Sequence, residues 1–134
     1  MDRHFNYQHL VKTITAHDQT EEEKVRSILS WTHSHILQAP QELPIVDDHV
    51  WSIIVRGYGS SDQAQDVFAT LCNYAGIHAC FRCLTDEETK QKRCFSMIQL
   101  KDGWTFVDAS RGLIYLNARG TFAGIDDLQS GDFQ

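Results

Sequence analysis

The residues of this chain that could carry out chemistry begin in a glycine-rich turn that contains two serines. The run Gly57-Tyr58-Gly59-Ser60-Ser61-Asp62 precedes a segment with helical periodicity, so Ser61 falls at the start of a helix. There the free backbone N–H groups and the positive end of the helix dipole lie beside the side chain. Nucleophilic thiols are often placed in such a position because it favours the thiolate. The turn therefore marks a position where a nucleophile would be found.

The elements that must position this turn follow it directly. Apolar residues recur with the spacing of one buried helical face, at Ala64, Val67, Phe68, Leu71 and Ala75. Gly76 then fits the glycine that ends a helix, and the alternation of apolar residues from Ala79 to Leu84 is typical of a strand. The sequence thus predicts a turn, a helix, a tight stop and a strand within residues 56–84.

This stretch resembles the core motif of the transglutaminase-like superfamily, which shares its catalytic layout with papain-type cysteine proteases. Family members carry a Gly-x-Gly-x-Cys-Asp-Gln turn, a helix and a Gly-Ile pair after the helix. Here Gly59-Ser60-Ser61-Asp62-Gln63 and Gly76-Ile77 match that pattern in spacing. The resemblance implies an α+β fold of the papain-like type, and it places Ser61 where the family has its nucleophilic cysteine.

The resemblance also implies a Cys–His–Asp triad. In such a triad a thiolate attacks an amide or ester carbonyl, an imidazole shuttles the proton and a carboxylate orients the imidazole. The family's Trp-x-x-x-Asp pattern matches Trp104 to Asp108, which makes Asp108 the triad carboxylate. Counting back across the predicted hairpin places the imidazole position at Cys94, to within one residue on either side (Arg93 or Phe95).

Two of the three triad members are therefore missing. Ser61 replaces the thiol, Cys94 replaces the imidazole, and no histidine occurs after His78. A serine hydroxyl is a weak nucleophile without an adjacent base, and loss of general-base help alone costs about 10²–10⁴ in rate. The sequence predicts a catalytically inactive domain that needs no cofactor and whose former active-site cleft binds a peptide, a protein or a glycan.

Two catalytic alternatives stay open. A divergent acyltransferase or amide hydrolase could work through Ser61, with His49 as a relocated base, or through Cys94 as a relocated nucleophile. Cys94 is otherwise a small strand residue that fills the space left by an imidazole, and Asp108 could cap a neighbouring backbone turn instead of orienting a base. Asp62 is expected to stabilise the helix N-terminus through its dipole.

The cysteines fall inside predicted elements, which favours reduced, partly buried thiols over a disulfide framework; they are Cys72, Cys80, Cys83 and Cys94. Cys80 and Cys83 form a CxxC pair that could be half of a zinc site. A strand, however, places residues three apart on opposite faces, and no second close pair accompanies them. Small apolar core residues are therefore the preferred interpretation, and no metal site is predicted.

The rest of the chain predicts helices first and antiparallel strands last, which is the α+β order. A helix is expected within residues 5–16, and Thr20 and Glu23 form a capping box before a second one. Asp48 is expected to cap a short helix over residues 49–56. Strands over residues 94–100 and 104–108 flank an Asp-Gly turn, which is a strong hairpin signal. A further strand is expected over 113–116 and a helical turn over 125–128.

Length and composition fit one globular domain spanning residues 1–134, with 42% hydrophobic residues. The formal net charge of −6, with no cluster of Lys and Arg, argues against nucleic-acid binding. No apolar run approaches the roughly twenty residues of a membrane span, and the N-terminus shows no signal-peptide pattern. A cytoplasmic location without membrane contact is the default expectation, and the oligomeric state is left open.

Overall fold

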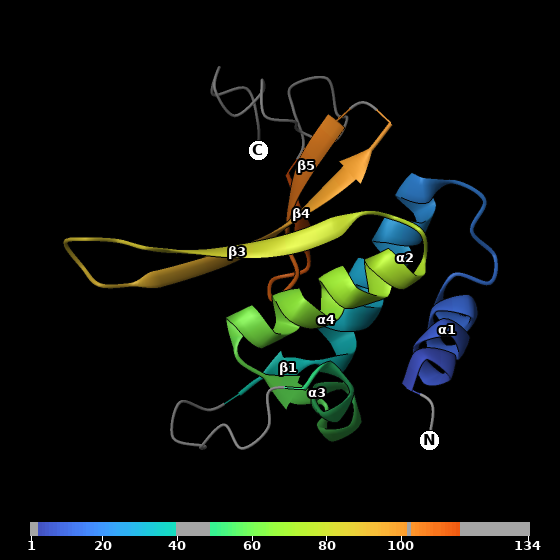
Figure 1. Cartoon of the computed structure of the whole chain (residues 1–134). Coiled ribbons are helices and arrows are strands. Elements are labelled where there is room, and N and C mark those ends of the chain that lie inside the picture. The colour runs from blue at the N-terminus through green and yellow to red at the C-terminus, as the bar shows by residue number, and fades with distance from the viewer. Residues whose placement is uncertain (1–2, 40–48, 102, 116–134) are drawn as a thin grey trace.

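The computed structural model describes residues 3–39, 49–101 and 103–115. Four helices lie on one side of a four-stranded antiparallel sheet with the strand order β3-β4-β5-β6 (Figure 1). The helices are α1 (Arg3–Ile14), α2 (Glu21–His35), α3 (Val50–Arg56) and α4 (Ser61–Tyr74). The strands of this sheet are β3 (Ala79–Thr85), β4 (Lys92–Leu100), β5 (Gly103–Asp108) and β6 (Leu113–Ile114). The α+β fold that the sequence predicts is confirmed.

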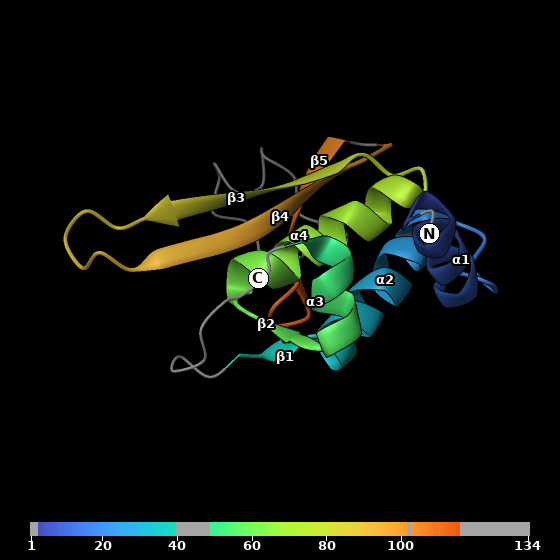
Figure 2. The same ribbon diagram turned by 60° about the horizontal axis from the view of Figure 1, so that its bottom comes forward.

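Helix α4 is the centre of this arrangement. It packs against β3 and β4 on one side and against the other three helices on the other (Figures 1 and 2). Its apolar face is fully buried, and Phe68 is the largest of the side chains with no exposed area. The helix ends as expected, because Gly76 takes a φ of +86° that a side chain would disfavour. There Ile77 N donates to Cys72 O and Gly76 N donates to Asn73 O, which closes the last turn.

The other helices begin close to where the sequence places them. Thr20 Oγ1 accepts a hydrogen bond from Glu23 N at the start of α2 and donates one to the Glu23 carboxylate. Helix α3 is capped by His49, whose Nδ1 accepts from Trp51 N, so this helix begins at Val50, one residue later than expected. A small parallel sheet joins β1 (Leu37–Gln38) to β2 (Tyr58–Gly59) beside α3. Asp48 and the helical turn expected over 125–128 lie outside the described residues.

The sheet alternates strictly between two faces. Ala79, Ile98 and Thr105 lie in register on the face that packs against α4, and all three are buried. Their neighbours Met97 and Phe106 also pair with each other, but on the outer face, where both are half-buried. This alternation is what the period of two along a strand requires when one face covers a core.

The expectation of four reduced thiols is wrong for two of them. Cys83 on β3 and Cys94 on β4 lie directly opposite each other and form a disulfide, with their Cα atoms 4.1 Å apart. The pair could not be recognised from spacing, because it depends on the register of the β3–β4 hairpin. Cys72 and Cys80 remain free thiols, and Cys80 lies on the outer face while Cys83 lies on the helix face.

The central position of α4 leads to a first prediction. Phe68→Ala should lower the free energy of unfolding by about 3–5 kcal/mol, because it removes a fully buried ring and leaves a cavity. Denaturant unfolding followed by circular dichroism measures the loss. Val55→Ala, at a position on α3 that is 72% exposed, is the matched control and should change stability by less than about 0.5 kcal/mol. Equal losses in the two variants would contradict the placement of the core.

Candidate functional site

The turn before α4 has a structural reason for each of its glycines. Gly57 adopts a φ of +79° as it ends α3. A Cβ on Gly59 would lie 2.9 Å from Gln63 Oε1 and 3.1 Å from Gln63 Cβ, so any side chain there would displace the Gln63 amide. The Gln63 oxygen instead accepts from Ser60 N at 3.0 Å and from Arg56 Nη2 at 2.9 Å. The turn is thus folded around the side chain of Gln63, and it delivers Ser61 to the first position of α4.

The hydroxyl of Ser61 points to the turn that follows β5. Ser61 Oγ lies 3.3 Å from Ser110 Oγ, and Ser110 Oγ donates to Asp108 Oδ1 at 2.7 Å. The structure therefore brings Ser61 and Asp108 to one place, although they are linked through Ser110 and not through an imidazole. Ser110 is a residue that the sequence analysis missed.

Asp108 is held by groups of the protein itself. Its Oδ1 also accepts from Gln65 Nε2 at 3.0 Å and from the backbone N–H groups of Ser110 and Arg111, at 3.1 and 3.3 Å. Arg111 Nε lies 3.7 Å from the other carboxylate oxygen, and the Asp108 side chain is only 13% exposed. Asp108 thus caps the turn that follows it, which is the alternative role that the sequence left open.

The buried amide of Gln65 joins these elements, and it too was missed. Gln65 has no exposed area, and its Oε1 accepts from Ser96 Oγ at 2.7 Å and from Ala109 N at 3.1 Å. Its Nε2 also lies 3.4 Å from the backbone oxygen of Cys94. One signal could have revealed it: Gln65 precedes Phe68 and Cys72 by three and seven residues, so it shares their buried face.

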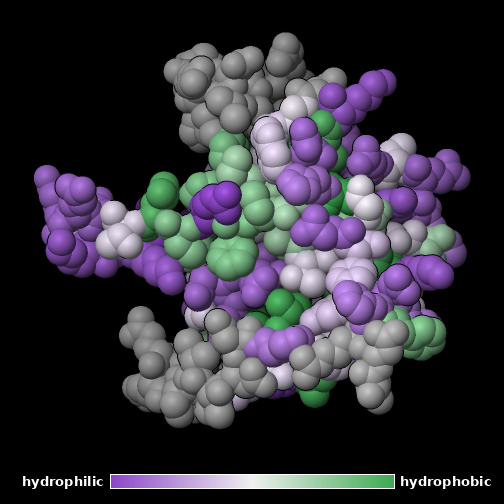
Figure 3. Space-filling model, in the orientation of Figure 1, coloured by the Kyte–Doolittle hydropathy of each residue, from purple (hydrophilic) through white to green (hydrophobic). Residues whose placement is uncertain are grey.

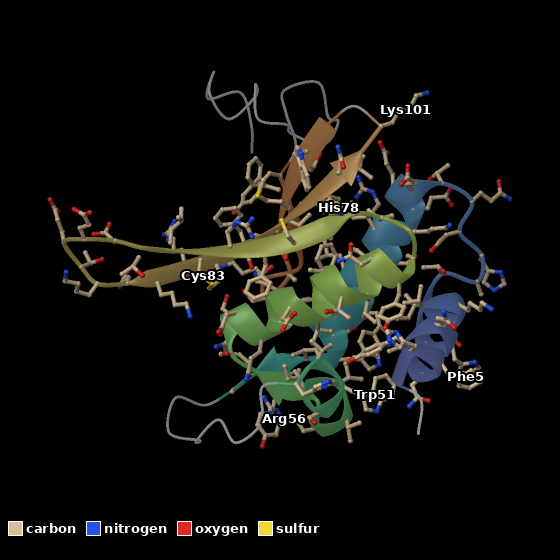
Figure 4. All side chains as sticks on the ribbon, viewed as in Figure 1. Phe5, Trp51, Arg56, His78, Cys83 and Lys101 are labelled. Carbon is tan, nitrogen blue, oxygen red and sulfur yellow. A yellow bond between two sulfur atoms is a disulfide. The ribbon has the colours of Figure 1, made fainter. Side chains whose placement is uncertain are left out.

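The position expected for the imidazole holds no proton shuttle. The Cys94 sulfur is bonded to Cys83, so Cys94 is not a free nucleophile either. Figure 4 shows His78 and Cys83 towards opposite ends of β3. The ring of His78 packs against Trp104. His49 accepts from Trp51 N as a helix cap, whereas the hydrogen bond that Ser61 makes within the described residues goes to Ser110. The Ser61–His49 pair expected as an alternative is not formed there.

Asp62 and Lys92 form the rim of the site. Asp62 accepts from the Ser60 hydroxyl, and its Oδ2 lies 3.5 Å from Lys92 Nζ at the start of β4. Burial raises the pKa of Asp62, but the hydrogen bond from Ser60 and the charge of Lys92 outweigh that effect and leave the pKa below its usual value. A carboxylate in the first turn also complements the helix dipole, so Asp62 stabilises the start of α4.

The order of these elements and the position of Ser61 define the class of protein. The transglutaminase-like superfamily model matches residues 8–109, so this chain belongs to the transglutaminase-like superfamily. The matched region begins within α1 and ends directly after Asp108. No curated protein matches the sequence.

Two solved structures share the fold. One is a proposed cysteine protease from Cytophaga hutchinsonii, with a TM-score of 0.69 and 14% identity over 89% of this chain and 40% of that one. The other is a proposed protease from Parabacteroides distasonis, with a TM-score of 0.63 and 13% identity over 79% of this chain and 23% of that one. The chain therefore spans less than half the length of either neighbour.

Within the described residues, no helix is long and apolar enough to cross a membrane.

The network around Gln65 leads to a second prediction. Gln65→Met keeps the side-chain volume but leaves Ser96 Oγ and Ala109 N without their acceptor, so the free energy of unfolding should fall by about 2–4 kcal/mol. Gln99→Met, at an exposed position of β4, is the matched control and should be close to neutral. Thermal and denaturant unfolding compare the two, and a neutral Gln65→Met would show that the network does not support the fold.

Proposed function

We propose that this transglutaminase-like domain is catalytically inactive and binds a peptide, a protein or a glycan at its former active site. The observation that carries this proposal is the set of hydrogen bonds that the Asp108 carboxylate accepts. The Oδ1 oxygen of the carboxylate matched to the triad accepts hydrogen bonds from Gln65, Ser110 and Arg111, and Arg111 Nε lies 3.7 Å from Oδ2, so these partners belong to the fold and none is an imidazole. In this proposal Ser61 holds the nucleophile position, Cys94 the histidine position and Asp108 the carboxylate position.

The missing groups support inactivity on energetic grounds. A thiolate–imidazole pair supplies both a strong nucleophile and a general base, and each loss costs orders of magnitude in rate. Ser61 has a hydroxyl as its hydrogen-bond partner in the described part of the chain, and Cys94 is in a disulfide. What the site retains is a half-buried group of hydroxyls beside Asp62, Lys92 and Arg111. Such groups bind the amides of a peptide or the hydroxyls of a sugar.

The contacts of Ser61 favour a second candidate function, a serine hydrolase or acyltransferase. In that mechanism Ser61 Oγ attacks a carbonyl carbon while its proton passes to Ser110 Oγ, and the proton of Ser110 passes to Asp108. Two features stand against it. The Ser61–Ser110 contact of 3.3 Å is long for an O–H···O hydrogen bond, and Asp108 already accepts from three other donors. We therefore place inactivity first.

The disulfide also bears on where the domain works. Disulfides persist in oxidising compartments and are rare in the cytosol. Cys83–Cys94 therefore supports an oxidising compartment over the cytoplasmic location expected from the sequence.

Covalent labelling separates inactivity from the serine mechanism. An alkyl fluorophosphonate should leave Ser61 unmodified in the wild-type protein, as judged by intact mass and peptide mapping, because no base activates the hydroxyl. Asp108→Asn and Ser110→Ala serve as controls. Labelling of Ser61 that disappears in both variants would establish the serine mechanism and end the proposal of an inactive site.

Binding at the site is tested with arrays of peptides and glycans. The wild-type protein should bind one class, and Ser61→Arg should weaken that binding by at least about tenfold, because a long cation then fills the first turn of α4. Glu22→Arg adds the same side chain at an exposed position of α2, so it is the matched control. If Ser61→Arg and Glu22→Arg both bind an array ligand as tightly as the wild type does, that ligand binds at a surface other than the site at Ser61.

A further inference from the structure

The outer edge of β3 has a hydrogen-bond pattern that the proposed function does not use. Strand β3 is at one end of the strand order, so among the described residues β4 is the strand that pairs with it (Figure 2). Beyond the two ends of β3, Gln99 N donates to His78 O and Asp86 N donates to Gln91 O, both in the β3–β4 register. Bonded pairs alternate in an antiparallel ladder, so residues 80, 82 and 84 bond to β4. Phe81 and Cys83 therefore direct their backbone groups away from the sheet.

The first residue of this edge is already occupied by an amide. Ala79 N donates to Asn73 Oδ1 at 3.0 Å, and Asn73 Nδ2 donates to Ala79 O at 2.9 Å. These are the two bonds that a residue of a neighbouring strand would make, supplied here by a side chain from the end of α4. The edge thus accepts a peptide-like amide at Ala79 but is left open at the next positions within the described residues.

Arg82 protects one of the remaining groups. Its Nη1 donates to Phe81 O at 3.0 Å, which leaves Phe81 N and both backbone groups of Cys83 without a partner among the described residues. Natural edge strands avoid pairing by means of charged side chains, proline, bulges or inward-pointing charges. Strand β3 has no proline and no inward-pointing charge, and its one charged side chain is Arg82, which lies on the outer face of the sheet.

The outer face beside this edge is apolar around Arg82. Leu84 is 63% exposed, and Phe95 and Met97 of β4 are half-buried on the same face, with the ring of Phe95 against Phe106. Figure 3 shows hydrophobic side chains gathered over β3 and β4 around a hydrophilic one. A strand added at the edge would place alternate side chains over this surface.

A second copy of the chain is a poor occupant. Two antiparallel registers satisfy Phe81 and Cys83 of both copies. One pairs the two Cys83 residues and places Arg82 opposite the other copy's Leu84, which gives the guanidinium no acidic partner. The other pairs each Phe81 with the other copy's Cys83. That register places the two Arg82 side chains directly opposite each other, and like charges in that position are destabilising. A different strand with an acidic residue opposite Arg82 meets no such penalty.

We propose that the β3 edge binds an extended peptide as an added antiparallel strand. The peptide carries an acidic side chain opposite Arg82 and apolar side chains two residues before and after it, over the surface formed by Leu84 and Met97. A peptide N–H replaces Arg82 Nη1 at Phe81 O, which releases the guanidinium for the acidic side chain. This surface is separate from the site at Ser61, and the proposal goes beyond the function given above.

The test uses acetyl-Thr-Val-Thr-Glu-Thr-Val-amide, which ends opposite Cys80 and leaves the Asn73–Ala79 hydrogen bonds in place, and residue-resolved NMR of the ¹⁵N-labelled protein. In the free protein, the amides of Phe81 and Cys83 should exchange with solvent faster than those of Cys80 and Arg82. Adding the peptide should shift and protect them. Slow exchange in the free protein would overturn the proposal, because the edge would already be covered. Shifts confined to other elements, or shifts that depend on protein concentration without peptide, would overturn it too.

Two matched pairs test the geometry and the charge. N-methylation of the threonine before the glutamate removes an N–H that faces β3 and should abolish binding, whereas N-methylation of the glutamate, whose N–H faces away, should preserve it. Replacing the glutamate of the peptide by lysine should weaken binding by about two- to fivefold. Arg82→Glu should reverse that preference, and Lys12→Glu, the same charge change at an exposed position of α1, should not. Equal effects within either pair would contradict strand addition at this register.

One further control keeps this proposal separate from the function at Ser61. Ser61→Arg should bind the threonine-rich peptide as the wild type does, even if it loses its array ligand. Loss of peptide binding in Ser61→Arg would show that the peptide occupies the old active site and not the edge of β3.

Discussion

The buried amide of Gln65 holds the two halves of the site together. It is the side chain of α4 that reaches β4 through Ser96 and the turn after β5 through Ala109 and Asp108. A buried polar group is tolerated only when its hydrogen bonds are made, so the positions of these three partners are set together. The distance between Ser61 and the end of β5 follows from this constraint, since Ser61 lies one helical turn before Gln65.

The same network explains how the fold accommodates Ser61, Cys94 and Asp108 without an imidazole between them. A triad carboxylate without its imidazole would leave a half-buried charge in need of partners, which is costly. Asp108 accepts hydrogen bonds from the backbone of its own turn and from Gln65, and Arg111 lies close to its second oxygen. On the other strand, the Cys94 sulfur is bonded to Cys83 and does not face an empty space. The site is therefore stable as it stands, without a substrate or a base.

Much of this architecture could be predicted from the sequence. The helix from Ser61, the glycine stop at Gly76 and the Asp-Gly hairpin are local signals, and each is set by residues close in the chain. The burial of Gln65 could be inferred from its helical spacing, but its hydrogen-bond partners, the Cys83–Cys94 bond and the role of Ser110 could not be predicted, for one physical reason. They depend on which residues of different elements come face to face, and strand register and helix rotation determine this only in the folded chain.

The position of the disulfide has a consequence for how the chain responds to proteases. The turn between β3 and β4 is exposed and projects beyond the helices, which is where proteolytic nicking concentrates (Figure 1). Cys83 and Cys94 close the hairpin on either side of that turn, eleven residues apart. A single cut within it therefore separates the helices from β4, β5 and β6 in sequence but not in covalent structure. The two fragments migrate as one molecule until a reductant is added.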